Sequence, residues 1–190
     1  MAKVHMGCGG SIIGLWDGET DWINLDINID PALWDNPKSL ELIDGFPRVM
    51  RGDLRKTPFP DNFAEAIHSH HSLEHVRIDE VLPTLREWHR ILKPGGQVHI
   101  NVPDLEWVAQ QIVQTKGDLL WSEMGERTGD WETGYTKLIH CIFGDQSNSS
   151  YQLHKTGFTA PYLIGLLRQA GFTVTQAESR GIEMGMFCLN

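Results

Sequence analysis

Short apolar runs bounded by turn-forming residues recur along the first hundred positions of the chain and predict a series of β-strands. Glycine, proline, asparagine and aspartate stand between the runs, where they favour turns and loops. Five strands are expected in this part of the chain, at residues 3–6, 22–27, 49–54, 64–69 and 98–102.

Apolar residues at helical spacing predict the helices. An amphipathic pattern begins at Asp79, which is expected to cap the helix, and the turn at residues 93–96 ends it. A second helix is predicted over residues 103–115. A third follows Thr159, its expected cap, and Gly171 ends it.

Strands that alternate with helices predict a doubly wound α/β fold with a mostly parallel, Rossmann-like sheet. The last apolar runs, residues 172–176 and 184–189, are close enough to form an antiparallel hairpin. The first crossover, residues 7–21, is expected to be short or irregular. Residues 31–47 carry three prolines and are expected to be a loop with at most a short helix near residues 39–43.

Length and composition indicate an ordinary globular protein. The 190 residues are expected to form one domain, residues 1–190, and 41% of them are hydrophobic. A net charge of −9 disfavours binding to a phosphate backbone, so no nucleic-acid partner is expected. No apolar run approaches the ~20 residues of a membrane span, and no signal peptide is recognised. Three widely spaced cysteines form no disulfide framework, which favours a reducing, cytoplasmic location.

The first candidate site is the glycine-rich turn that follows the first strand. Gly7, Gly9 and Gly10 let the backbone turn tightly and approach a ligand. Asp26 lies 19 positions after Gly7, at the end of the second strand, as in a nucleotide-binding βαβ unit. The dinucleotide fingerprint G-x-G-x-x-G is incomplete because its sixth position is Ile12. This departure leaves room for an adenosine cofactor other than NAD or FAD.

Taken in order, several motifs between residues 4 and 103 resemble class I S-adenosylmethionine-dependent methyltransferases, and in particular the small type 11 methyltransferase domains. The motifs are Val-His-Met-Gly-Cys-Gly at residues 4–9, Trp-Ile-Asn-Leu-Asp-Ile at 22–27, Gly-Asp-Leu at 52–54, Leu-Glu-His-Val at 73–76 and Leu-Lys-Pro-Gly-Gly at 92–96. The resemblance implies a seven-stranded sheet whose last strand runs antiparallel. It also implies S-adenosyl-L-methionine as the cofactor.

The resemblance implies a role for each cofactor-binding residue. The turn Gly7-Cys8-Gly9 would pass under the methionine portion of the cofactor. Asp26, with Ile27 beside it, would accept hydrogen bonds from the ribose hydroxyls. Asp53 would accept from the adenine amino group, with the amide of Leu54 nearby. His70 follows the fourth strand and is also expected to contact the cofactor.

Histidines are the candidate catalytic residues. In the resembling family the loop after the fourth strand faces the transferable methyl group, and His71 lies in this loop. A neutral imidazole is suited to accept a proton near pH 7, so His71 is expected to be a general base with an apparent pKa of roughly 6 to 7. His154 is a weaker candidate that could reach the substrate. Packing or solvent-facing roles remain alternatives for each of these histidines.

Two further features bear on the acceptor and on a metal. Residues 104–150 match no motif of the family and contain Trp121, Trp131 and Tyr135, which are expected to help form the acceptor pocket. Four histidines lie between residues 68 and 75, but no cysteine or carboxylate follows a known zinc spacing, so no metal is expected.

The sequence therefore predicts methyl transfer from S-adenosyl-L-methionine to an oxygen or nitrogen atom of a small-molecule acceptor. A non-catalytic module that binds S-adenosylmethionine or a nucleoside metabolite is the main alternative. A metal-dependent hydrolase that uses the histidine run is a second one. The sequence leaves the acceptor's identity and the oligomeric state open.

Overall fold

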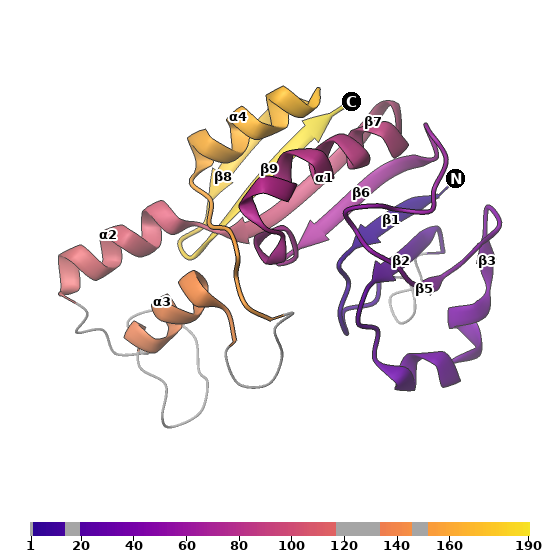
Figure 1. Cartoon of the computed structure of the whole chain (residues 1–190), viewed down its shortest axis with the longest axis horizontal. Helices are drawn as coiled ribbons and strands as arrows, with labels where there is room; N and C mark the ends of the chain where they lie inside the picture. Colours follow the sequence, from indigo (N-terminus) through magenta and orange to yellow (C-terminus); the bar gives the residue numbers. More distant parts are fainter. Residues whose placement is uncertain (1, 14–19, 117–133, 146–151) are drawn as a thin grey trace.

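The computed structural model describes residues 2–13, 20–116, 134–145 and 152–190, and a seven-stranded sheet forms its centre (Figure 1). The strands lie in the order β5-β2-β1-β6-β7-β9-β8. Their bounds are β1 Lys3–Met6, β2 Trp22–Asp26, β5 Val49–Arg51, β6 Ala64–His70, β7 Leu92–Pro103, β8 Thr173–Ser179 and β9 Glu183–Leu189.

Strand direction in the sheet follows the predicted pattern. The pairs β5–β2, β2–β1, β1–β6 and β6–β7 are parallel, whereas β9 runs antiparallel to both β7 and β8. The expected mostly parallel, seven-stranded sheet with an antiparallel last strand is thus confirmed. Because β5, β2, β1 and β6 are parallel neighbours, their carboxyl ends meet at one edge of the sheet.

One face of the sheet carries the main hydrophobic core. Helices α1 (Ile78–Ile91) and α4 (Ala160–Ala170) lie together against this face (Figure 1). Trp88 of α1 is fully buried, and its indole N–H donates to the carbonyl of Leu54 at 2.9 Å. This bond satisfies the buried indole N–H and anchors the loop after β5 to the helix.

The opposite face of the sheet is more polar. His5, His68 and His99 stand in register on β1, β6 and β7, so their side chains project from the same face. The ring centroids of neighbouring histidines are 5.2 and 5.1 Å apart. Burial lowers the pKa of both His5 and His68 to about 4, so these two imidazoles are neutral at pH 7.

Several predicted boundaries are corrected by the structure. Helix α1 begins at Ile78 with Arg77 at its N-cap, so Asp79 lies in the first turn and is not the cap. Strand β5 ends at Arg51, and the amide of Gly52 makes the last bond to β2 by donating to the Asp26 carbonyl. Strand β7 begins at Leu92, directly after α1, which makes it longer than predicted.

The region between β2 and β5 contains more structure than a loop. Two 3-10 helices, η1 (Pro31–Asp35) and η2 (Pro37–Leu40), precede a two-stranded ribbon of β3 (Leu42–Ile43) and β4 (Phe46–Pro47). Side chains of Asp30 and Asn36 cap the two 3-10 helices by accepting main-chain N–H bonds. These local caps make short helical turns possible in a proline-rich segment.

The region after β7 begins with α2 (Leu105–Thr115), where the Asp104 carboxylate caps the first turn. Helix α3 (Gly134–Phe143) packs against α2 through Val108 and Leu138. Trp121 and Trp131 lie outside the described residues, and the expectation for the acceptor pocket falls largely on them. In the described part of the chain, none of the helices combines the length and apolar character needed to cross a bilayer.

We predict that the two glycines after β1 differ in their tolerance of a side chain. A Cβ at Gly7 would stand 2.3 Å from the Cβ of Ser72, and Gly7 has a φ of +67°. Gly9, with a φ of +52°, has open space where its Cβ would be. Gly7→Ala should lower the free energy of unfolding by about 2–5 kcal/mol, and Gly9→Ala by about 1–2 kcal/mol. Urea denaturation of both variants measures this difference, and equal losses would contradict it.

Candidate functional site

A pocket of about 280 Å³ lies at the carboxyl ends of β1, β2, β5 and β6. This is the edge at which open α/β sheets bind their ligands. Its volume is close to the lower end of small-molecule sites. Most of the sequence-predicted site residues line it, namely Gly7, Gly9, Asp26, Ile27, Asp53, Leu54 and His71.

The turn after β1 is held by hydrogen bonds to β2. The amide of Gly7 donates to the Leu25 carbonyl at 2.8 Å, and the amide of Gly9 donates to the Asp26 carboxylate at the same distance. Gly7 must lack a side chain because Ser72 packs against its Cα. Gly9, in contrast, presents bare backbone to open space. A ligand can therefore approach the main chain at Gly9 more closely than at a residue with a Cβ.

Asp26 is fixed in orientation by the main chain on both sides. One carboxylate oxygen accepts from Gly9, and the other accepts from the amide of Asn28 at 2.7 Å. An ionised carboxylate has about four acceptor sites, so each oxygen can still accept a further hydrogen bond. The half-buried carboxylate lines the pocket, where two vicinal hydroxyls could donate to it. The residues present thus fit the ribose of a nucleoside cofactor.

Asp53 belongs to an ionic network on the same side of the pocket. Arg55 contacts Asp53 at 2.7 Å and Glu80 at 2.9 Å, so one guanidinium joins the loop after β5 to the start of α1. The hydrogen bonds from Arg55 hold the pKa of Asp53 below its usual range. Asp53 therefore stays ionised at neutral pH, with its position set by Arg55. Arg55 itself was not predicted as a site residue.

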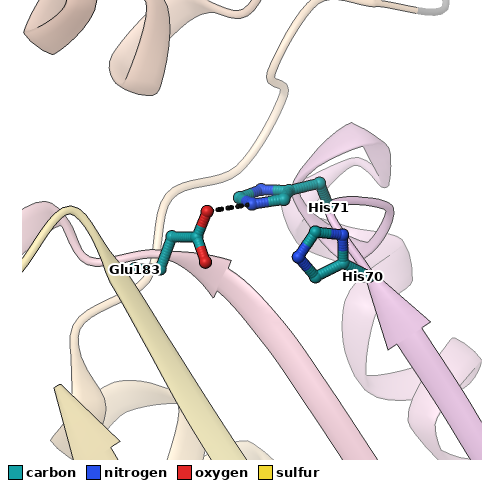
Figure 2. A group of neighbouring side chains, drawn as sticks. All are labelled: His70, His71 and Glu183. Atoms are coloured by element: carbon teal, nitrogen blue, oxygen red, sulfur yellow. Dashed lines mark hydrogen bonds and ion pairs between the residues drawn. The ribbon is translucent and has the colours of Figure 1, made fainter. Parts of the chain in front are cut away.

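His71 is held between two carboxylates. Its Nδ1 lies 3.1 Å from Glu74, and its Nε2 lies 2.9 Å from Glu183 of β9. Figure 2 shows the Glu183 carboxylate pointing at the His71 ring. Burial alone would lower the pKa of His71, but the two carboxylates outweigh burial and raise it to about 9. His71 is therefore an imidazolium at neutral pH, and its pKa lies above the range of 6 to 7 expected from the sequence.

The backbone after β6 separates two adjacent histidines. His71 has a φ of +49°, a left-handed conformation that is unusual for a residue with a Cβ. The His70 and His71 rings meet edge to face at a centroid distance of 4.4 Å. The exposed His70 borders a different hollow, together with His5 and His68 on the polar face of the sheet. Of these two histidines, only His71 lines the pocket at the strand ends.

Two other predicted site residues also lie outside the pocket lining. The Cys8 side chain is buried with Ile12, Ile29 and Val49, and burial raises the pKa of its thiol. Cys8 can therefore contribute to a ligand site only through its main chain. His154 is largely buried behind the pocket wall, with its Nε2 4.0 Å from Glu74. Burial lowers the pKa of His154, so its imidazole is neutral at pH 7.

Sequence reasoning missed several residues that line the pocket. They are Asn28, Gly52, Arg55, Ser72, His75, Val76, Gln152 and Lys155. Most of them directly follow or neighbour a motif residue, so the strand-end rule could have included them. Of the two carboxylates that hold His71, Glu74 lies within the motif at residues 73–76, whereas Glu183 carried no such signal. Glu74 and Glu183 are far apart in the chain and meet only because β9 lies beside β7.

Comparison with known proteins gives one curated relative. It is a malonyl-[acyl-carrier protein] O-methyltransferase from Halorhodospira halophila, 28% identical over 137 residues. The match covers 72% of this chain and 39% of the relative. The chain thus spans well under half the length of this relative.

Solved structures share the fold. A S-adenosylmethionine-dependent methyltransferase from Mesorhizobium loti superposes with a TM-score of 0.65 and 18% identity, over 100% of this chain and 90% of that one. The 1,6-didemethyltoxoflavin-N1-methyltransferase of Burkholderia thailandensis, solved with S-adenosylhomocysteine, superposes with a TM-score of 0.62 and 16% identity. The match covers 100% of this chain and 70% of that one. A protein solved in complex with the Haloferax volcanii methyltransferase activator Trm112 superposes with a TM-score of 0.62 and 16% identity. The match covers 99% of this chain and 81% of that one.

The family model described as "Methyltransferase domain" matches residues 4–100, about half of the chain, and this range includes the carboxyl ends of all four strands that form the pocket. Both this match and the shared fold agree with the strand-end pocket. The chain therefore belongs to this family of methyltransferase domains, and its fold is that of S-adenosylmethionine-dependent methyltransferases.

Proposed function

We propose that the chain transfers a methyl group from S-adenosyl-L-methionine to an oxygen or nitrogen atom of a small molecule. The observation that carries this proposal is the pocket at the strand ends, where the open backbone of Gly9, the oriented carboxylate of Asp26 and His71 meet. Membership in the methyltransferase domain family supports it.

When bound, S-adenosylmethionine supplies an electrophilic methyl group on a sulfonium. The residues of the chain would then bind the cofactor and orient it relative to the acceptor. Asp26 would accept hydrogen bonds from the ribose hydroxyls, and Asp53, held by Arg55, would accept from the adenine amino group. Alignment of the acceptor atom with the methyl carbon would supply much of the rate acceleration.

The choice of a small acceptor rests on a structural neighbour, whereas the curated relative, whose acceptor is carried by a protein, supports only the choice of an oxygen atom. The curated relative is an O-methyltransferase of a malonyl-acyl-carrier protein, and one structural neighbour is an N-methyltransferase of a toxoflavin precursor. Oxygen and nitrogen acceptors therefore both fit the fold. We include residues 104–150 in this proposal, because α2 and α3 lie beyond the carboxyl end of β7, where they could cover an acceptor (Figure 1).

The role of His71 depends on its charge. By position it is the proton acceptor favoured by the sequence, because it follows β6 and lines the pocket. A base must be neutral to act, and a group with a pKa of about 9 is mostly protonated at pH 7. The His71 imidazolium would instead brace the pocket at neutral pH by joining β9 to the loop after β6. His154, the second catalytic candidate from the sequence, stays a prediction, and it does not line the pocket.

We predict that Asp26→Ala weakens binding of both S-adenosylmethionine and S-adenosylhomocysteine. The loss of charge-assisted hydrogen bonds to the ribose costs about 1.5–3 kcal/mol, which corresponds to roughly 10- to 150-fold in affinity. Isothermal titration calorimetry measures the change directly. Asp21→Ala is the matched control, because this exposed aspartate lies just before the opposite end of β2 and should bind as the wild type does. Absence of binding by the wild-type protein would refute the proposed function.

A second prediction concerns the pH dependence of turnover. If His71 is the base, the rate should rise as the pH increases through about 9, because only the neutral imidazole accepts a proton. Glu183→Gln removes one of the two carboxylates that stabilise the imidazolium, so the midpoint should move to lower pH. Turnover is measured against pH for both proteins with saturating cofactor and a converted acceptor.

Substitution of His71 distinguishes two roles for its side chain, that of a general base and that of an imidazolium that only joins β9 to the loop after β6. His71→Gln should lower the turnover number by at least about 10²-fold if the imidazole accepts the proton. Its affinity for S-adenosylhomocysteine should change little, which calorimetry checks. A variant that keeps nearly full activity, with a pH profile that follows the acceptor, would show that alignment alone suffices.

A further inference from the structure

A cluster of three potential metal ligands lies beside the pocket. Glu74 and His75 come from η3 (Leu73–His75), and His154 comes from the segment that leads to α4. One carboxylate oxygen and one ring nitrogen from each histidine all lie within 4.8 Å of one another. His75 also lines the strand-end pocket, so the cluster adjoins the proposed cofactor site.

The Glu74 carboxylate is buried, and only one of its two oxygens has a hydrogen-bond partner among the described residues. Its side chain is only 1% exposed, and its Oε2 has no hydrogen-bond partner among the described residues. The other oxygen, Oε1, contacts His71 at 3.1 Å. A buried carboxylate oxygen without a partner is costly, and such an oxygen commonly binds a water molecule or an ion. A cation near Glu74 would satisfy it.

The main chain brings the two halves of the cluster together. The amides of Lys155 and Thr156 donate to the Glu74 carbonyl at 2.8 and 3.1 Å. The Thr156 hydroxyl, in addition, donates to the Val76 carbonyl at 2.7 Å. These bonds hold His154 beside η3 even though the two segments lie far apart in the sequence. The site is therefore supported by backbone contacts and not by the side chains alone.

Both histidines carry the hydrogen bonds typical of metal ligands. The Nδ1 of His154 lies 2.9 Å from the Cys141 carbonyl, so it donates and leaves Nε2, 4.0 Å from Glu74, with a free lone pair. The Nδ1 of His75 lies 3.1 Å from the Leu153 carbonyl, which likewise leaves its Nε2 as an acceptor. Metal-bound histidines usually donate their second ring N–H to such a carbonyl, which fixes the tautomer and the ring.

We propose that Glu74, His75 and His154 bind a divalent transition-metal ion, with Zn²⁺ as the best match. Two imidazoles and one carboxylate form a donor set that suits Zn²⁺ and leaves coordination positions open. Bond lengths of about 2.0–2.2 Å require the ligand atoms to move closer by roughly an ångström, which side-chain rotation can supply. Metal binding at this site does not depend on the proposed methyl transfer.

A neighbouring group is a weaker candidate for the same ion. His70, His71 and Glu183 also bring three potential ligand atoms within 4.8 Å (Figure 2). Both ring nitrogens of His71, however, are already in hydrogen bonds with carboxylates. A metal bound to His71 would have to displace one of these contacts, whereas Glu74 pairs with His71 through Oε1 and keeps Oε2 without a hydrogen-bond partner among the described residues. Substitutions in the two groups therefore show which group binds the ion, because only those in the true site should weaken metal binding.

The test is metal binding by the full chain after removal of any affinity tag and treatment with a chelator. Zn²⁺ is titrated by calorimetry, and Co²⁺ is followed by its visible absorption, which reports imidazole and carboxylate ligation. The wild-type chain should take up a single equivalent of each ion. Glu74→Gln and His154→Gln should each weaken binding by at least about 100-fold, since the loss of a ligand should cost no less than the loss of its supporting hydrogen bond.

Two control variants locate the ion. Glu183→Gln removes a ligand of the neighbouring group, and His99→Gln removes a histidine from the polar face of the sheet; both should bind Zn²⁺ as the wild type does. Zn²⁺ should also raise the unfolding midpoint of the wild type and of these controls, but not of Glu74→Gln or His154→Gln. Should one of those two fail to fold, His75→Gln takes its place.

Two results would overturn the proposal. One is the absence of stoichiometric Zn²⁺ binding by the wild-type chain. The other is binding that survives Glu74→Gln and His154→Gln, or that is lost in Glu183→Gln. Calorimetry of S-adenosylhomocysteine with the metal-free protein tests the proposed function separately, so that the failure of one proposal is distinguishable from the failure of the other.

Discussion

The pocket depends on the close contact between the turn after β1 and the turn after β6. Ser72 packs directly on the Cα of Gly7, where no side chain fits. Its hydroxyl also donates to the Met6 carbonyl at 3.0 Å and lies 2.7 Å from the hydroxyl of Ser69. This buried contact joins the candidate cofactor turn to the segment that carries His71. Both walls of the pocket are therefore in direct contact, and the glycine at position 7 serves packing within the protein more directly than ligand approach.

Glu74 extends this arrangement to the remainder of the site. Its side chain contacts His71, and its carbonyl accepts from the amides of Lys155 and Thr156. A buried residue with these contacts ties the loop after β6 to the segment before α4. Through His71 the same network reaches Glu183 on β9. The antiparallel strand β9, which lies between β7 and β8 in the sheet, is thus connected to the site.

Charge is distributed unevenly around the pocket. The side near β2 and β5 carries the carboxylates of Asp26 and Asp53, the second of which is paired with Arg55. The side near β6 carries His71, which two carboxylates keep protonated at neutral pH. An acidic wall suits a cofactor with a cationic sulfonium and ribose hydroxyls. Because His71 is charged at neutral pH, it cannot take a proton from an acceptor in that state.

The sequence by itself determined the sheet, its strand directions and the residues that line the pocket at the ends of β1, β2 and β5. Gly7, Gly9, Asp26 and Asp53 each stand at the end of a predicted strand, and parallel strands bring their carboxyl ends to one edge whatever their side chains are. Only the tertiary structure decided the ionisation of His71 and the grouping of Glu74, His75 and His154. These depend on Glu183 and on the segment before α4, whose distance from η3 along the chain conceals their contact. The pKa of an imidazole and the geometry of a ligand cluster are set by neighbours a few ångströms away, and no local pattern in the sequence records which neighbours those are.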